Sequence, residues 1–173
     1  MNKLSVLILL LIFAACGEEK KEMPKIDWDQ DKSTKFNKEL AIEEEINIKL
    51  FLEHKQTWQM TKTGSGLQYY IYKNGTGERT ATEGDIAQVE MKISLLDGKE
   101  CYATKSDEYE EFVIDKSDIE TGIQEGIKKL RVGDQAKLII PSHLAHGLIG
   151  DMDKIPPLST IVVDIKLIGL VTK

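Results

Sequence analysis

Few residues of this chain have side chains that could do chemistry. His143 and His146 are three residues apart, a spacing that can bring two imidazoles to one metal ion. No carboxylate-rich ligand set accompanies the pair, so we predict no metal site. His146 has two open interpretations, since it can donate a hydrogen bond to a ligand or satisfy a loop carbonyl group. Cys101 is interpreted as a small buried hydrophobic residue, and the three glutamates within residues 108–111 as a solvated loop.

Another reactive side chain lies near the start of the chain. An unbroken apolar run follows Lys3, from Val6 to Ala15, and ends at Cys16. The run is shorter than the roughly 20 apolar residues that a membrane-spanning helix needs, so residues 1–15 are predicted to be a signal peptide. The wording Phe-Ala-Ala-Cys resembles a bacterial lipobox, although leucine is usual where phenylalanine stands. We predict that Cys16 carries lipid and anchors the protein to a membrane; the alternative is an ordinary secretory signal with a chance cysteine.

Charge and cysteine content exclude several classes of protein. The 173 residues include 23 Lys+Arg against 29 Asp+Glu, a net charge of -6. A nucleic-acid partner is not expected, because phosphate binding needs a basic face. Two cysteines cannot build a disulfide framework. The length fits one compact domain, commonly on the order of 100 to 150 residues, with additional segments.

Two segments precede the predicted domain. Residues 16–36 are polar and are predicted to form a flexible tether, because they cannot bury enough apolar surface to offset their ordering entropy. Ile42, Ile46 and Leu50 then follow the spacing i, i+4, i+8, and Phe51 and Leu52 widen the apolar stripe, which predicts an amphipathic helix within residues 37–62. Its apolar face must pack against the following domain or a second copy, and the sequence does not decide between them.

Alternation of apolar and polar residues dominates the rest of the chain. Residues 87–95 alternate strictly and end at an Asp-Gly turn, as in a strand with one buried face. Ile123, Ile127 and Leu130 have the spacing of one short helix, and a glycine lies just past its end. Many short strands with one helix predict an α+β domain, in which the helix packs on an antiparallel sheet. Weaker alternation marks four further strands: residues 67–73, 111–115, 135–140 and 160–168.

Short motifs follow one another in a distinctive order from residue 66 to residue 170. They are Gly-Leu-Gln-Tyr from 66, Gly-Thr-Gly from 75, Glu-Gly-Asp from 83, Asp-Gly-Lys from 97, Gly-Ile-Gln-Glu-Gly from 122, Val-Gly-Asp-Gln-Ala-Lys from 132, Ile-Pro-Ser-His-Leu-Ala-His-Gly from 140, Ile-Pro-Pro from 155 and Val-Asp-Ile-Lys-Leu from 163. In this order they resemble the FKBP-type peptidyl-prolyl cis-trans isomerases. The resemblance implies a twisted antiparallel half-barrel around one short helix over residues 66–170, here preceded by the amphipathic helix.

The resemblance also implies a binding site whose aromatic lining is altered. His146 stands where the family has a tyrosine, Ile123 where it has the tryptophan of the pocket floor, and Ile155 is kept. We assign these three to the catalytic site, with residues 148–154 as a flap over it. Replacing aromatic rings by aliphatic side chains should enlarge and soften the cavity. The implied substrate-binding residues are Met91, Tyr102, Phe112, Ile119, Glu120 and Val163. As an alternative, Met91, Ile123 and Val163 are simply core residues.

The function implied by the resemblance is isomerisation of X-Pro bonds, without cofactor or metal. The expected substrates are proline-containing segments of exported proteins, and the expected location is the bacterial envelope, at the periplasmic or outer-membrane surface, through lipidated Cys16. The helix and the domain entry resemble envelope lipoproteins of Bacteroidetes, and the wording His-Leu-Ala-His-Gly from 143, with the lipobox, resembles gliding-motility lipoproteins. The altered lining implies weak activity. The alternative is a catalytically weak or inactive FKBP-fold lipoprotein that serves as a binding or structural part of an envelope machine.

Overall fold

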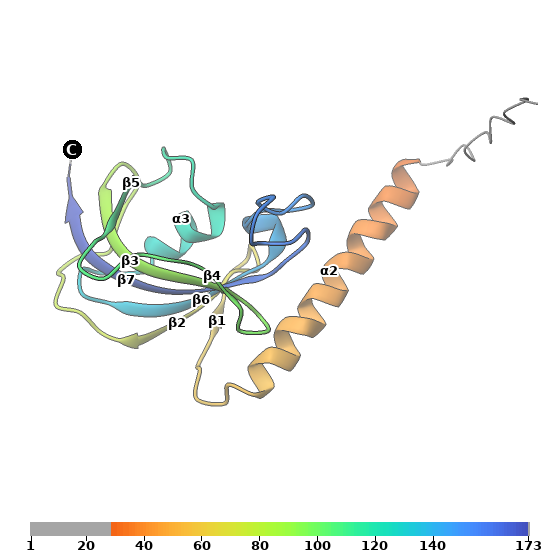
Figure 1. The fold of residues 1–173 in the computed structure, drawn as a ribbon, viewed down its shortest axis with the longest axis horizontal. Helices are drawn as coiled ribbons and strands as arrows, with labels where there is room; N and C mark the ends of the chain where they lie inside the picture. Colours follow the sequence, from red (N-terminus) through yellow and green to blue (C-terminus); the bar gives the residue numbers. More distant parts are fainter. Residues whose placement is uncertain (1–28, 173) are drawn as a thin grey trace, which may run out of the picture. The chain divides into compact units, whose positions relative to one another are not determined.

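The computed structural model describes residues 29–172 (Figure 1). The predicted signal peptide, Cys16 and residues 16–28 of the predicted tether lie outside the described residues. The chain divides into two compact units, Met1–Asn37 and Lys38–Lys173. Helix α2 (Gln30–Glu53) begins in the first unit, and its later turns belong to the second. No helix in the described part of the chain is long and apolar enough to cross a membrane.

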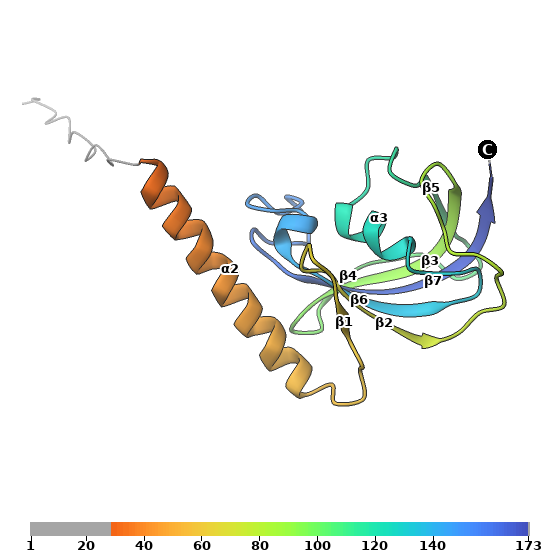
Figure 2. The same cartoon turned by 180° about the vertical axis from the view of Figure 1, so that it is seen from behind.

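The second unit is built on one antiparallel sheet of seven strands. The strand order is β1-β2-β6-β7-β3-β4, and β5 also pairs with β3. Two views show the sheet curving around the short helix α3 (Thr121–Ile127) (Figures 1 and 2). A 3-10 helix, η2 (Ser142–Leu144), follows β6. The strands are β1 (Thr61–Lys62), β2 (Gln68–Lys73), β3 (Ile86–Leu95), β4 (Glu100–Ala103), β5 (Glu110–Val113), β6 (Gln135–Ile140) and β7 (Ile161–Val171).

The alternation in β3 determines which face of the sheet is buried. Ala87, Val89, Met91 and Ile93 are all buried, whereas the residues between them are partly or fully exposed. These four side chains join one large core cluster with residues of α3, β6 and β7. An α+β fold with an antiparallel sheet around a short helix is therefore confirmed.

Helix α3 lies close against the sheet because two of its residues are glycines. A Cβ atom at Gly122 would be 2.2 Å from Cγ2 of Ile140, and one at Gly126 would be 2.6 Å from Cδ1 of Leu138. Both neighbours belong to β6 and are fully buried. A larger side chain at Gly122 would push the helix away from the sheet, because the β-branched Ile140 cannot easily turn aside, whereas at Gly126 the end of the Leu138 side chain can shift.

The lead-in helix differs from its predicted bounds of 37–62. Helix α2 spans Gln30–Glu53, so it starts inside the stretch predicted as tether. It ends before residue 62, because the chain turns and then enters the sheet as β1. Apolar spacing alone marks neither end: the first turns of the helix are polar, and apolar residues continue past its last turn to Trp58 and Met60.

The side of α2 that packs on the domain coincides only in part with the predicted stripe. Ile48 is buried in a small cluster with Ile139 of β6 and Val162 of β7. By contrast, the three predicted stripe residues are about half exposed: Ile42 (50%), Ile46 (52%) and Leu50 (50%). Phe51 and Leu52, which widen the predicted stripe, are partly buried and pack against this cluster, so the packed side overlaps only this flank of the stripe.

Candidate functional site

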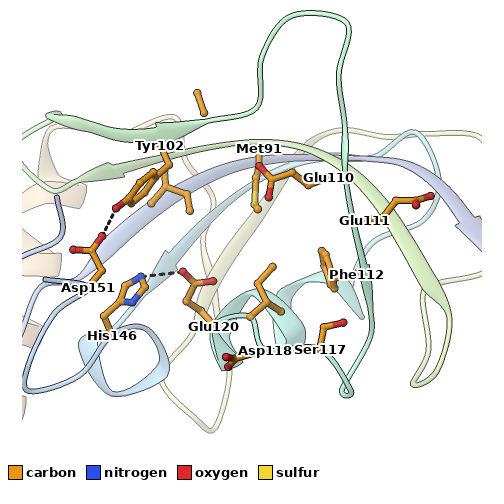
Figure 3. A pocket seen from close by; sticks show the side chains of 13 residues that line it. Met91, Tyr102, Glu110, Glu111, Phe112, Ser117, Asp118, Glu120, His146 and Asp151 are labelled. Carbon is orange, nitrogen blue, oxygen red and sulfur yellow. Dashed lines mark hydrogen bonds and ion pairs between the residues drawn. The ribbon is translucent and has the colours of Figure 1, made fainter. Parts of the chain in front are cut away.

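A hollow of about 510 Å³ lies between strands β3, β4 and β5, the segment before α3 and the loop after η2 (Figure 3). Its volume falls in the range of small-ligand pockets, about 300–1,000 Å³, and can take one or two side chains of a peptide. Its lining residues are Met91, Ile93, Tyr102, Ala103, Glu110, Glu111, Phe112, Ser117, Asp118, Ile119, Glu120, His146 and Asp151.

The floor of the hollow is apolar. Met91 and Ile93 occupy successive inward positions on β3, and Phe112 occupies an inward position on the paired strand β5. All three side chains are less than one-tenth exposed. Ile119 adds a partly buried apolar side chain just before α3. This floor can receive a small apolar ring and exclude water from it.

One wall of the hollow is a hydrogen-bonded pair, Tyr102 and Asp151. The Tyr102 hydroxyl donates to Oδ2 of Asp151 at 2.5 Å. Oδ1 of Asp151 accepts from the backbone N–H groups of Asp153 at 2.9 Å and Ile155 at 2.7 Å. Burial acts to raise the pKa of Asp151, but these hydrogen bonds lower it well below its usual value. The hydrogen bond to Asp151 raises the pKa of Tyr102, so the pair is a neutral phenol on an ionised carboxylate.

A second polar pair is formed by His146 and Glu120. Nε2 of His146 lies 2.9 Å from Oε1 of Glu120, and the two side chains are 25% and 15% exposed. Nε2 has no hydrogen-bond partner of good geometry within residues 29–172. The contact is therefore a charge pair when the imidazole is protonated, rather than an aligned hydrogen bond. Figure 3 shows both pairs at the same end of the hollow.

The walls of the hollow are strongly acidic. Five carboxylates line it, and no Lys or Arg is among the lining residues. Lys154 lies outside the lining but close to it, with its Nζ 4.6 Å from the centre of the Tyr102 ring. The two glutamates of β5 were expected in a solvated loop, but this strand brings them to the hollow. The five are Glu110, Glu111, Asp118, Glu120 and Asp151.

Six of the nine predicted site residues line the hollow: His146, Met91, Tyr102, Phe112, Ile119 and Glu120. The structure places Ile123, Ile155 and Val163 in the hydrophobic core instead, with at most 2% of each exposed. Ile123 and Val163 reach less far than the aromatic rings they replace, so they fill the core without forming the floor. Ile155, which is kept, also packs in the core, and its N–H donates to Asp151 at the edge of the hollow. The alternative interpretation as core residues describes Ile123 and Val163. No contact here tests which residues hold a substrate.

Sequence reasoning gave no role to Asp151, Ser117, Asp118, Ile93 and Ala103, which also line the hollow. Asp151 was only a member of the predicted flap. The one local signal is its spacing to Asp153, because an Asp side chain often accepts from the backbone N–H two residues later.

The remaining candidate groups make separate contacts. Nε2 of His143 lies 3.0 Å from the carbonyl oxygen of Ser65, away from the imidazole of His146 in the hollow. Within the described residues, no group of three or more His, Cys, Asp or Glu side chains could hold a metal ion. Cys101 is buried, and this burial raises the pKa of its thiol.

Comparison with known proteins identifies the family. The model of the FKBP-type peptidyl-prolyl cis-trans isomerase family matches residues 77–168. FkpA, an isomerase of this type from Buchnera aphidicola subsp. Schizaphis graminum, is 34% identical over 136 residues, which cover 79% of this chain and 52% of the relative. FkpA from Escherichia coli K12 is 33% identical over 131 residues, covering 75% and 47%. The chain therefore spans about half the length of the curated relatives it matches.

Solved structures agree with these relatives. The crystal structure of FkpA from Escherichia coli matches with a TM-score of 0.66 and 25% identity, covering 99% of this chain and 74% of that chain. A peptidyl-prolyl cis-trans isomerase from Pseudomonas syringae has the same fold, with a TM-score of 0.61 and 22% identity over 72% of this chain and 90% of that chain. The chain belongs to the FKBP-type peptidyl-prolyl cis-trans isomerase family.

Proposed function

We propose that the protein catalyses the cis-trans isomerisation of X-Pro bonds and so assists the folding of exported proteins. The observation that carries this proposal is the apolar-floored hollow of about 510 Å³ in a chain of this family. Uncatalysed isomerisation takes tens to hundreds of seconds, which is slow enough to limit folding. The FkpA relatives, which are named as isomerases, support the same activity.

The chemistry needs no nucleophile. Rotation about the X-Pro amide loses resonance and meets a barrier of about 18–20 kcal/mol. The twisted amide is less dipolar than the planar one, so it loses less on leaving water. When a pyrrolidine ring lies on Met91, Ile93 and Phe112, its X-Pro amide is in a water-poor environment. This environment would therefore lower the barrier to rotation about the amide bond. His146 is the side chain best placed to hold the substrate carbonyl group, once its ring turns from Glu120.

The location proposed for the protein is the bacterial envelope. Lipidated Cys16 would anchor it to a membrane, and the polar segment that follows would act as tether, leaving the domain free to meet exported chains. The support is the lipobox-like start of the sequence. The resemblance to envelope lipoproteins of Bacteroidetes, including those of gliding machinery, supports the same location.

A second candidate function is binding without catalysis. Of the donors that could hold a substrate carbonyl group, the Tyr102 hydroxyl and the Ile155 N–H already donate to Asp151, and Nε2 of His146 lies against the carboxylate of Glu120. A donor that must first give up its interaction with a carboxylate gains little free energy from a new hydrogen bond to a substrate carbonyl oxygen. The protein would then grip proline-containing segments as a structural part of an envelope assembly.

An assay of cis-trans isomerisation in an X-Pro peptide decides between catalysis and binding without catalysis. We expect the wild-type chain to accelerate isomerisation, and Ile119→Asp, which places a charge beside the floor, to reduce kcat/KM at least tenfold. Val171→Asp is the matched control, because Val171 is 47% exposed at the end of β7 and outside the hollow. Lack of acceleration by a wild-type protein with a folded circular dichroism spectrum would leave only the binding function.

Metabolic labelling with palmitate tests the anchor. We expect label on the wild-type chain and none on Cys16→Ser, since the thiol is the acceptor of the lipid. Label retained by the serine variant would show that Cys16 is not the lipidated residue.

A further inference from the structure

One carboxylate of α2 binds the domain at two points that are distant in sequence. Oε1 of Glu44 accepts hydrogen bonds from the backbone N–H of Ser142 at 2.6 Å and from the Thr160 hydroxyl at 2.6 Å. Oε2 accepts from the Ser142 hydroxyl at 3.1 Å. Both partners are buried, at 6% and 5% exposure. Three donors on one carboxylate make a strong, directional contact, because hydrogen bonds to an ionised acceptor are about twice as strong as neutral ones.

The two partners of Glu44 stand at the two ends of one long connection. Ser142 follows the last residue of β6, Ile140, after a single proline, and Thr160 directly precedes β7. The connection over residues 142–160 has only the short η2 as regular structure, and loops of this length inside a compact domain are commonly functional. Glu44 therefore ties the base of this loop together.

A path of hydrogen bonds leads from Glu44 towards the hollow. Ser142, whose N–H donates to Glu44, accepts through its own carbonyl oxygen from the N–H of Gly147 at 2.8 Å. The carbonyl oxygen of Gly147 accepts from Leu158 at 2.9 Å. Gly147 is the neighbour of His146 in the chain. The same loop also carries Asp151, a member of the other polar pair (Figure 3).

The middle of the loop has little packing of its own. Leu148, Ile149 and Met152 are 66%, 68% and 85% exposed, so few apolar contacts hold this part. Met152 and Leu158 also have positive φ values, 61° and 56°, which are unfavourable for residues with side chains. Within the loop, the hydrogen bonds of Asp151 and the buried Ile155 hold the segment that follows, whereas the part next to His146 is held from the base of the loop.

We infer that Glu44 is a positioning residue, which couples the packing of α2 on the domain to the placement of His146 and Asp151 in the hollow. Ile48 lies one helical turn after Glu44 and is buried against Ile139 and Val162, so the seating of α2 fixes where the carboxylate stands. The effect on loop order follows from these contacts alone, whereas the effect on catalysis rests on the proposed isomerase function.

The test compares Glu44→Ala and Glu44→Gln with Glu43→Ala, an exposed glutamate on the same helix. Amide hydrogen exchange is measured on the full chain, together with the kinetics of cis-trans isomerisation of an X-Pro peptide. In Glu44→Ala we expect exchange at Gly147 and Leu158 to accelerate at least tenfold, without acceleration at strand residues such as Val163. In Glu44→Gln, which keeps one acceptor oxygen, the acceleration should be smaller, and in Glu43→Ala absent. The kinetic effect should fall mainly on KM, because the loop lines the hollow.

The outcomes separate this inference from the proposed function. Unchanged exchange at Gly147 and Leu158 in both Glu44 variants overturns the positioning role, even if the wild type is an active isomerase. Acceleration spread evenly over the sheet in both variants also overturns it, since Glu44 would then only stabilise the whole domain. Selective acceleration in a chain without isomerase activity would support the positioning role and remove the proposed function.

Discussion

The seating of α3 on the sheet can be tested by adding a single methyl group. In Gly122→Ala the new Cβ would lie 2.2 Å from Cγ2 of Ile140 and 3.2 Å from its Cβ and Cδ1, whereas carbon atoms pack best at about 3.5–4.0 Å. Ile140 is fully buried and β-branched, so it cannot easily turn aside. Overpacking costs up to about 3 kcal/mol, and alanine in a helix regains about 1 kcal/mol over glycine. The free energy of unfolding should fall by about 2 kcal/mol.

Urea denaturation followed by circular dichroism measures this change, and two other glycines serve as controls. Gly126→Ala meets only the flexible end of Leu138, at 2.6 Å, so its overpacking and its helix gain should nearly cancel. Gly64→Ala has no neighbouring atom within 4 Å and should change stability by less than about 0.5 kcal/mol. If Gly122→Ala were as stable as these two, the argument that glycine seats α3 on β6 would be refuted. A displaced α3 would also move Glu120, so isomerase activity should fall with stability.

Two further predictions concern charge. The hydrogen bond from Arg79 is the main cause that lowers the pKa of Asp85 to about 2, from an ordinary value of 3.8. The contribution of ionised Asp85 to stability is therefore complete above pH 3.8 and is lost as the pH falls through about 2, so the melting temperature should drop over this interval. Asp85→Asn should be less stable than the wild type at pH 7, and its melting temperature should lack the part of the drop that comes from this carboxylate. Because the hollow is lined by carboxylates, peptides with lysine beside proline should be isomerised several-fold faster than peptides with glutamate at that position. This difference should shrink in 1 M salt and in the Asp118→Asn variant. Equal rates for the two peptides would show that the acidic lining does not act on the substrate.

The parts of the fold that were predicted are those where burial leaves a local pattern. Alternation along β3 and the spacing of Ile123 and Ile127 follow directly from which side chains face the core. The short strands β1 and β4 carry no such pattern, because few of their residues are buried. The packed side of α2 was predicted only in part, for a different reason. Its strongest polar contact joins Glu44 to donors about a hundred residues away, and no local spacing encodes that.

Which predicted residues line the hollow depends on how far each side chain reaches and not on whether the family residue is kept, since the kept Ile155 lies in the core. Met91 and Phe112 still point into the hollow, whereas Ile123 stands at an aromatic position and stays in the core. The hydrogen bond between Tyr102 and Asp151 joins residues 49 apart in sequence. No local pattern around either residue therefore predicts that the two are partners. Pairs of this kind arise from the folded path of a loop rather than from the composition of a segment.

The balance between catalysis and simple binding depends on how dry the hollow becomes when it is filled. The apolar floor of Met91, Ile93 and Phe112 favours the less dipolar twisted amide, but the surrounding carboxylates retain water, which stabilises the planar one. A cationic side chain beside the proline would pair with these carboxylates and displace part of that water. The same charge that improves binding would then lower the barrier. We therefore expect the preference for lysine to be larger in kcat/KM than in the affinity measured for the same peptides, and equal preferences would contradict this coupling.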